Sequence, residues 1–217
     1  MYYETKDLTR EKLQALGLSF NPFKAIVAPR PIGWVTTVDS KGAVNLAPYS
    51  FFNAVSSDPP MVFYGANGKH DADGGEKDSL RNVRETGEFV CNLVNWDLRH
   101  AMNDTSTSAP HGIDETEVAG LATVPSTLVK PPRVAASPAN LECKVHQLLD
   151  LPRDPVTGDR NVMVIGMVVA VHIDDNFVVK GRFDTARAQP VARLGYHDYA
   201  VVTEAFEMVR PGWPLKK

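Results

Sequence analysis

Residues 30–65 read RPIGWVTTVDSKGAVNLAPYSFFNAVSSDPPMVFYG, and this stretch decides the fold. Turn-forming residues at 39–42 and 58–60 divide it into three predicted strands. Its middle, residues 45–53, combines a proline, two asparagines and a serine with three aromatic side chains. A plain core strand prefers apolar alternation without proline. A strand that presents its backbone and small polar groups to a flat ligand would have this composition.

The overall composition is that of a turn-rich globular domain. The 217 residues are 43% hydrophobic and 23% charged, and 16 prolines and 15 glycines are spread along the chain. This favours short strands over a helical bundle. A net charge of −3 provides no basic field for nucleic acid or for an anionic membrane. We therefore expect neither as a partner.

Cysteine usage and hydropathy indicate the compartment. Cys91 and Cys143 lie in apolar, strand-like segments without partners at metal-ligand spacing, which indicates buried free thiols. No apolar run approaches the ~20 residues that span a bilayer, and the N-terminal residues lack a signal-peptide pattern. We expect a cytoplasmic protein.

Strand signals outnumber helix signals along the rest of the chain. Residues 141–149 alternate between apolar and polar, and the apolar run 162–173 contains Gly166, which predicts a bulge or a close approach. Short helices are predicted between Thr9 and Gly17 and from Asp78 or Ser79 to Gly87. About six or seven strands without βαβ alternation predict an antiparallel barrel or sandwich with helices outside.

The start of the second helix is a candidate anion site. Backbone N–H groups are unpaired there, Lys77 precedes it, Ser79 offers a hydroxyl, and a glycine-rich loop comes before. Ordinary capping of the helix is the alternative. The carboxylate of Asp78 favours that alternative, because it repels a phosphate.

The aromatic residues and Arg30 also have two interpretations each. Tyr49, Phe51 and Phe52 can contact a ligand ring, or they can fill the core, since neighbours on a strand face opposite sides. Arg30 is held extended between two prolines and can pair with a phosphate or remain a surface charge.

Motifs for other chemistries are absent from the sequence. The six histidines show no compact ligand spacing, so we predict no metal site. There is no Walker loop, GxGxxG or GxSxG. Residues 106–116 form a polar loop that is either a lid over a site or a plain surface loop, and we favour the surface loop.

The stretch 30–65 closely resembles the first half of the flavin reductase-like, FMN-binding split-barrel family. KDSLRNVRETGEFVCNLV, which starts at Lys77, resembles that family's next helix and strand. PPRVAASPANLECKV and RLGYHDY, further along the chain, are similar to it more weakly. The resemblance covers roughly residues 20–202.

The resemblance implies a mainly β fold, a six-stranded Greek-key split β-barrel with a few short peripheral helices. It implies a homodimer with FMN near the subunit interface. It divides the chain into an N-terminal helical extension (1–19), an FMN-binding split-barrel domain (20–202) and a C-terminal tail (203–217). By this resemblance, the FMN ring would be contacted by Tyr49, Ser50, Phe51, Phe52 and Asn53. The FMN phosphate would be held by Lys77 and Ser79, and Arg30 is a weaker candidate for the phosphate.

One departure from the family pattern affects the expected activity. Many short flavin reductases carry an Asp-His pair where this chain has Arg160 and Asn161, so an NAD(P)H-binding residue is missing. The chain looks more like the flavoredoxin-type members. We expect an FMN-binding oxidoreductase that takes electrons from NADH, NADPH or another donor, without a catalytic side chain. The alternatives are an FMN-binding electron carrier without NAD(P)H activity and a barrel for another planar ligand, such as haem or a pyridoxal derivative.

Overall fold

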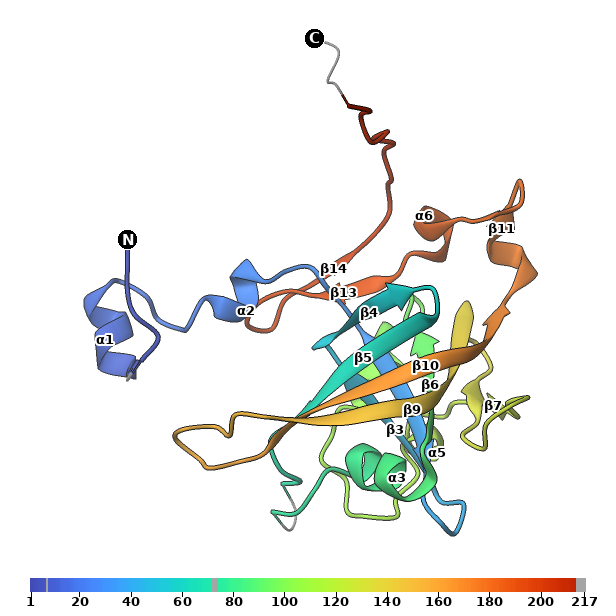
Figure 1. The fold of residues 1–217 in the computed structure, drawn as a ribbon, viewed down its shortest axis with the longest axis horizontal. Coiled ribbons are helices and arrows are strands. Elements are labelled where there is room, and N and C mark those ends of the chain that lie inside the picture. The colour runs from blue at the N-terminus through green and yellow to red at the C-terminus, as the bar shows by residue number, and fades with distance from the viewer. Residues whose placement is uncertain (7, 72–73, 214–217) are drawn as a thin grey trace.

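The computed structural model describes residues 1–6, 8–71 and 74–213. Its main element is an antiparallel sheet of seven strands in the order β3-β2-β6-β9-β10-β5-β4 (Figure 1). The strands are β2 (Gly33–Val38), β3 (Val44–Tyr49), β4 (Phe52–Ser57), β5 (Pro60–Asn67), β6 (Glu88–Leu93), β9 (Ala139–Leu151) and β10 (Asn161–Ile173).

A bend at Ser50 and Phe51 gives the sheet its shape. It separates β3, which pairs with β2, from β4, which pairs with β5, so consecutive strands lie at the two ends of the strand order. The backbone N–H of Gly65 donates to the carbonyl of Phe51 at 2.8 Å. The sheet therefore curls into the predicted split barrel, and β3 and β4 together form one bent strand of the expected six.

The expectation that the second strand runs unbroken through residues 45–53 is wrong. Pro48 lies next to the end of β3, which is an end strand of the sheet and tolerates a residue that cannot donate to a ladder. The bend follows, and a new strand begins at Phe52. The stretch 30–65 thus contains more strands than the three predicted.

The barrel encloses an apolar core centred on three rings. Tyr49 and Tyr64 lie 4.8 Å apart between ring centroids, and Tyr64 and Phe89 lie 5.4 Å apart. Gly166 interrupts the β9–β10 register, and a Cβ placed on it would lie 2.3 Å from Cζ of Phe89. The predicted bulge with close approach is confirmed.

Helix α3 (Asp78–Thr86) connects the core to the site. Leu80 and Val83 are buried in the barrel core, and Gly87 ends the helix at a φ of +70° as predicted. The N-cap residue is Lys77, and no described side chain caps the helix. The expectation that Asp78 or Ser79 caps α3 is therefore wrong, because both lie inside the first turn.

The remaining helices are short and peripheral. Thr9 caps α1, accepting from the N–H of Lys12 at 3.3 Å, as the sequence predicts. The others are listed here in chain order: α1 (Arg10–Ala15), α2 (Phe23–Ile26), α4 (Arg99–Asp104), α5 (Glu115–Val118), the 3-10 helix η1 (Asp175–Phe177) and α6 (Thr185–Ala188). Among the described residues, no helix is long and apolar enough to cross a membrane.

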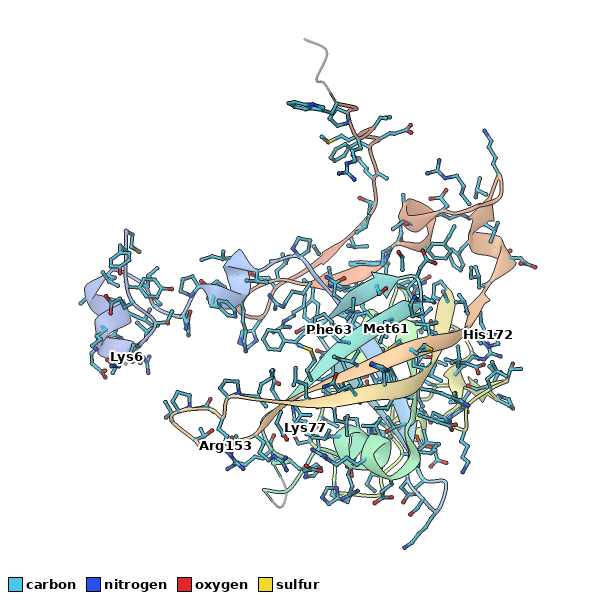
Figure 2. The ribbon with its side chains drawn as sticks, in the orientation of Figure 1. Lys6, Met61, Phe63, Lys77, Arg153 and His172 are labelled. Carbon is cyan, nitrogen blue, oxygen red and sulfur yellow. The ribbon has the colours of Figure 1, made fainter. Side chains whose placement is uncertain are left out.

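Short strand pairs complete the fold. One sheet, β1-β13-β14, joins β1 (Arg30–Pro31), β13 (Val191–Arg193) and β14 (Tyr199–Val201). The others pair β7 (Thr123–Val124) with β8 (Arg133–Val134) and β11 (Val178–Val179) with β12 (Arg182–Phe183). Figure 1 shows α1 and residues 203–213 extending away from the barrel, while Figure 2 places Arg153 and His172 toward opposite ends of the β9–β10 pair.

Candidate functional site

Two neighbouring pockets flank the β3–β4 bend and share Pro48 and Ser106. We call the first, of about 160 Å³, the helix pocket. Its lining is Asn45, Ala47, Pro48, Tyr49, Lys69, His70, Asp71, Lys77, Asp78, Ser79, Glu115 and residues 105–109. We call the second, of about 620 Å³, the bend pocket. Its lining is Asn21, Phe23, Lys24, Arg30, Ile32, Pro48, Ser50, Phe51, Met102, Asn103, Ser106, Arg193, Leu194, Tyr196, His197 and Tyr199.

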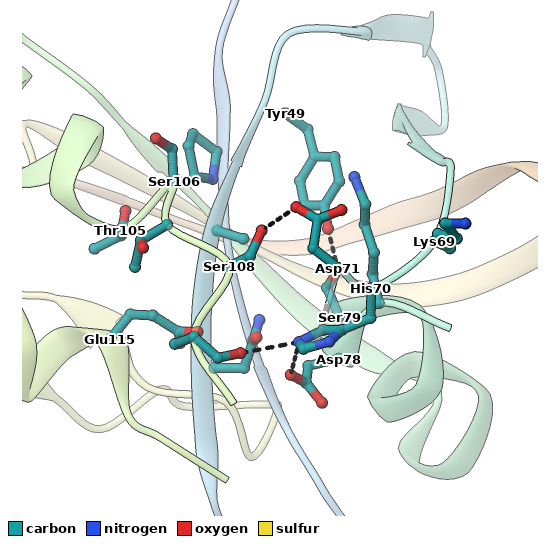
Figure 3. Close-up of a pocket in the computed structure, with 16 residues that line it drawn as sticks. Tyr49, Lys69, His70, Asp71, Asp78, Ser79, Thr105, Ser106, Ser108 and Glu115 are labelled. Atoms are coloured by element: carbon teal, nitrogen blue, oxygen red, sulfur yellow. Dashed lines mark hydrogen bonds and ion pairs between the residues drawn. The ribbon is translucent and has the colours of Figure 1, made fainter. Parts of the chain in front are cut away.

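The helix pocket brings Tyr49, Lys77 and Ser79 together, although strand and helix are far apart in the sequence. Figure 3 shows Tyr49 and Ser79 next to each other in this pocket. The hydroxyls of Tyr49 and Ser79 share a short hydrogen bond. Burial raises the pKa of Tyr49 to about 12, so the phenol stays protonated at neutral pH. The ammonium of Lys77 lies 5.9 Å from the centroid of the Tyr49 ring. Burial lowers the pKa of Lys77, and the charge of Asp71 opposes that effect.

The charge of the Asp78 carboxylate is balanced by Arg81, and two histidines lie beside it. It accepts hydrogen bonds from Arg81 and, at 2.6 Å, from Nδ1 of His111, while Nε2 of His70 lies 3.6 Å away. The His70 and His111 rings stack at 4.1 Å. The repulsion of a phosphate expected from Asp78 is therefore reduced.

The same residues place three potential metal ligands close together. Ligand atoms of His70, Asp78 and His111 all lie within 4.8 Å of one another. The guanidinium of Arg81 bonds Asp78 and lies 3.2 Å from Nδ1 of His111, so a cation already occupies the group. Stacked rings also do not direct two lone pairs at one point. We interpret the cluster as an ion-pair network.

Two loops close the helix pocket. Nε2 of His70 lies 2.9 Å from the carbonyl of Ala109, and Ser108 donates to Asp71. Residues 105–109 therefore line the pocket, whereas the sequence favoured a plain surface loop. His70, Asp71 and Ser108 were missed as site residues, because only the polarity of their loops signalled them.

Glu115 is a further residue of the helix pocket that the sequence did not indicate. Its side chain is buried, and its carboxylate accepts from the backbone N–H of Leu46 at 2.9 Å. Desolvation raises the pKa of this carboxyl, and the hydrogen bond from Leu46 partly opposes the rise. Glu115 thus anchors α5 to β3 at the edge of the pocket.

The four residues after Tyr49 separate into different environments. Ser50 and Phe51 line the bend pocket. The Phe52 ring packs inside the barrel, where a Cβ on Gly33 would lie 2.5 Å from it. Asn53 is exposed on β4, outside the lining of both pockets, and its side-chain oxygen accepts from the N–H of Ala54 at 2.8 Å. Only part of the predicted ring-contacting segment therefore faces a pocket.

Arg30 lines the bend pocket but makes a structural clamp. Its side chain is 6% exposed and donates to the carbonyls of Lys24, Val27 and Leu194. Burial lowers the pKa of Arg30, and the nearby charge of Arg193 adds to this effect. These bonds hold α2 against the loop after β13. A phosphate-binding role for Arg30 stays a prediction.

The positions that depart from the family pattern belong to a hairpin. Arg160 pairs with Asp150 at 2.8 Å and Glu76 at 3.3 Å, and Asn161 donates to the carbonyl of Pro152 at 2.9 Å. His172, the histidine further along β10, is held at 2.5 Å by the buried Glu142. All three side chains are therefore engaged in structural contacts.

Comparison with known proteins places this chain in a family. Residues 27–199 match the flavin reductase like domain, and the chain belongs to that family, as the sequence predicts. Nitrilotriacetate monooxygenase component B from Bacillus cereus is 29% identical, with a TM-score of 0.83 over 96% of this chain and 98% of that chain. The 2-nitrobenzoate 2-nitroreductase of Pseudomonas fluorescens is 28% identical, with a TM-score of 0.80 over 100% and 99% of the two chains.

The flavoredoxin of Desulfovibrio vulgaris has the same fold at lower identity. It is 18% identical to this chain, with a TM-score of 0.69 over 87% of this chain and 93% of that chain. The fold that the stretch 30–65 predicted is therefore shared by proteins whose sequences have diverged widely.

Proposed function

We propose that this protein is an FMN-dependent oxidoreductase that holds the phosphate end of FMN in the helix pocket and the ring along residues 48–51. The observation that carries the proposal is the contact of the two pockets through Pro48 and Ser106. A phosphate and a flat ring joined by a short chain need such a pair of adjoining pockets.

The helix pocket has the chemistry of a phosphate site. The first turn of α3 has unpaired N–H groups and a partial positive charge, and no side chain in the described part of the chain caps it. Lys77 is the N-cap residue of α3 and lines the same pocket, and the competing charge of Asp78 is compensated by Arg81. These features favour a phosphate over ordinary capping.

The bend supports binding of the ring. Ser50 and Phe51 are half-buried beside a pocket of about 620 Å³, which is within the usual range for an organic ligand. The flavin would supply the redox chemistry, whereas the chain would bind it, orient it and exclude water. No side-chain acid or base is part of the proposal. The redox functions named for the relatives from B. cereus and P. fluorescens favour an oxidoreductase.

The visible spectrum tests this proposal directly. Adding FMN to the purified protein should give a bound-flavin band with quenched fluorescence and micromolar or tighter affinity. A protein that binds haem or a pyridoxal derivative instead, as identified by mass spectrometry of the copurified ligand, would contradict it.

The electron donor is the finer part of the proposal. We infer that the protein takes its electrons from NADH or NADPH. The second candidate is an FMN-binding electron carrier that does not react with NADH or NADPH. Arg160 and Asn161, which stand where many short flavin reductases carry an Asp-His pair, are hydrogen-bonded within the hairpin, and this favours the electron carrier. Stopped-flow mixing of the FMN-loaded protein with NADH and with NADPH decides between them. Rapid bleaching excludes the carrier, and no bleaching with either excludes the reductase.

We also propose a cytoplasmic homodimer, with the domain boundaries predicted above. β10 exposes Val171 (55%) and Ile173 (45%), and β4 exposes Val55 (54%). Val171 and Ile173 line a hollow of about 270 Å³ whose surface is almost entirely apolar and which also includes Phe183. A second copy of the chain would cover this surface.

A further inference from the structure

The bend pocket carries a positive charge that the chain does not neutralise. Lys24, Arg30, Arg193 and His197 line it, and none of its described lining residues is an aspartate or glutamate. The helix pocket next to it contrasts with this, because Asp71, Asp78 and Glu115 balance its lysines. The whole chain has a net charge of −3, so the concentration of cations in one pocket is a local feature.

No ion pair relieves these charges within the described residues. Lys24, Arg30 and Arg193 have no carboxylate at ion-pair distance in that part of the chain. Arg30 donates to three backbone carbonyls from its two terminal nitrogens, and its buried Nε has no partner among the described residues. The pKa of Arg30 is lowered by burial and by the charge of Arg193. Like charges held together without a counterion favour the binding of an anion.

Aromatic rings line the same pocket. The ammonium of Lys24 lies 6.0 Å from the centroid of the Phe51 ring, and the guanidinium of Arg193 lies 4.4 Å from that of Tyr199. Tyr196 and Tyr199 are 47% and 40% exposed, although Arg193 covers one face of the Tyr199 ring and the Phe20 ring lies 5.7 Å from that of Tyr196. Rings of this kind stack on planar ligands.

We propose that the bend pocket binds a planar aromatic anion, with Lys24 and Arg193 as its charge contacts, and that this anion is the reaction partner of the flavin. The inference rests on the proposed function for the second part only, since an anion can bind the pocket whether or not FMN is present. An aromatic carboxylate and the nucleotide part of a dinucleotide share this chemistry.

Calorimetry with matched ligand pairs tests the charge requirement. We would titrate 4-nitrobenzoate and its neutral analogue 4-nitrobenzamide, and in parallel ADP-ribose and adenosine, into protein with and without FMN. The anion of one pair should bind more tightly than its neutral analogue by about tenfold or more, as expected for a charge-assisted contact. The pair that shows the difference identifies the source of the anion. Equal binding within both pairs would overturn the proposal.

Two substitutions assign the contacts. Lys24→Gln and Arg193→Gln should each remove most of the preference for the anion and leave the neutral analogue unaffected. Lys41→Gln, in the exposed turn before β3, makes the same change of charge outside the pocket and should alter nothing. Because Arg193 packs on Tyr199, thermal unfolding is recorded for each variant to show that it folds. If Arg193→Gln does not fold, Lys24→Gln alone tests the proposal, since Lys24 is exposed on α2.

The outcomes for FMN separate the two proposals. Wild-type protein that binds the anion but not FMN would contradict the proposed function and leave the anion site standing. A loss of FMN affinity in Lys24→Gln, with riboflavin unchanged, would show that the bend pocket takes the flavin phosphate. That result would overturn the anion site.

Discussion

Single residues show how the same sequence signal can serve structure or ligand binding. Lys77 and Arg30 are both basic and were both predicted to contact a phosphate. Lys77 precedes an uncapped helix and lines a pocket, whereas Arg30 donates to three carbonyls. The difference lies in the acceptors around each side chain, because a guanidinium whose terminal nitrogens donate to three carbonyls has fewer donors left for a ligand.

The role of Lys77 can be measured with a pair of flavins. Lys77→Ala should weaken FMN by about tenfold or more, since one charge-assisted contact contributes roughly 1.5–3 kcal/mol, and should leave riboflavin unchanged because riboflavin lacks the phosphate. Ser79→Ala should act in the same direction. Fluorescence titration with both flavins measures this, with Lys41→Ala as the control. An equal loss for FMN and riboflavin would place the phosphate elsewhere.

The buried phenols predict a loss of stability at high pH. Desolvation raises the pKa of Tyr49 to about 12, and it also raises the pKa of Tyr64 well above the ordinary value of about 10 that both phenols have in the unfolded chain. The folded state therefore keeps protons that the unfolded state releases. The associated stability is complete below about pH 10 and is lost as pH rises through the folded pKa.

Urea unfolding across this range provides the measurement. The free energy of unfolding should fall above about pH 10, and Tyr49→Phe should make the fall less steep because one of the two phenols is gone. A variant whose stability declines with the same slope as the wild type would show that Tyr49 does not contribute.

At the scale of elements, close approaches fix how strands meet. The bulge at Gly166 lets β10 pass the Phe89 ring of β6, and Gly33 of β2 lets the Phe52 ring of β4 reach the core. Each contact joins strands that are not consecutive in the sequence. Glycine is needed at these points because the neighbouring ring occupies the place of a Cβ.

Gly166→Ala should therefore destabilise the barrel. The new Cβ would lie 2.3 Å from a ring atom of Phe89 in a packed core, and overpacking of this kind costs roughly 1–3 kcal/mol. Gly212→Ala is the matched control, since nothing lies within 4 Å of a Cβ at that position. Thermal unfolding of the two variants compares them, and equal melting temperatures would contradict the assigned role.

At the scale of the molecule, the isolated chain leaves apolar sheet surface uncovered. Val171 and Ile173 on β10 and Val55 on β4 are all about half exposed. Extended strands with apolar faces are a surface that proteins usually cover. This surface is the basis for the proposed homodimer.

Light scattering combined with size exclusion tests the dimer. The wild type should have twice the chain mass, and Val171→Asp should shift it toward the monomer by placing a charge in the apolar contact. Val156→Asp introduces the same charge at a residue that is 90% exposed in the β9–β10 connection, and should leave the mass unchanged. A monomeric wild type would end the proposal.

The sequence by itself determined the local features of this protein. The turn at 39–42, the cap at Thr9, the stop at Gly87 and the bulge at Gly166 all follow from the preferences of a few neighbouring residues. The family also followed from one stretch of sequence, because its turn and strand residues recur in a fixed order.

Only the tertiary structure decided where these pieces meet. The sequence predicts one strand through residues 45–53, whereas pairing with β2 on one side and β5 on the other forces the bend between Tyr49 and Phe52. Lys24 and Arg193 come from opposite ends of the chain, and no pattern in the sequence brings them to one pocket. The reason is physical: local preference acts over a few residues, while a site is made by long-range strand pairing and loop packing that the sequence pattern does not encode locally.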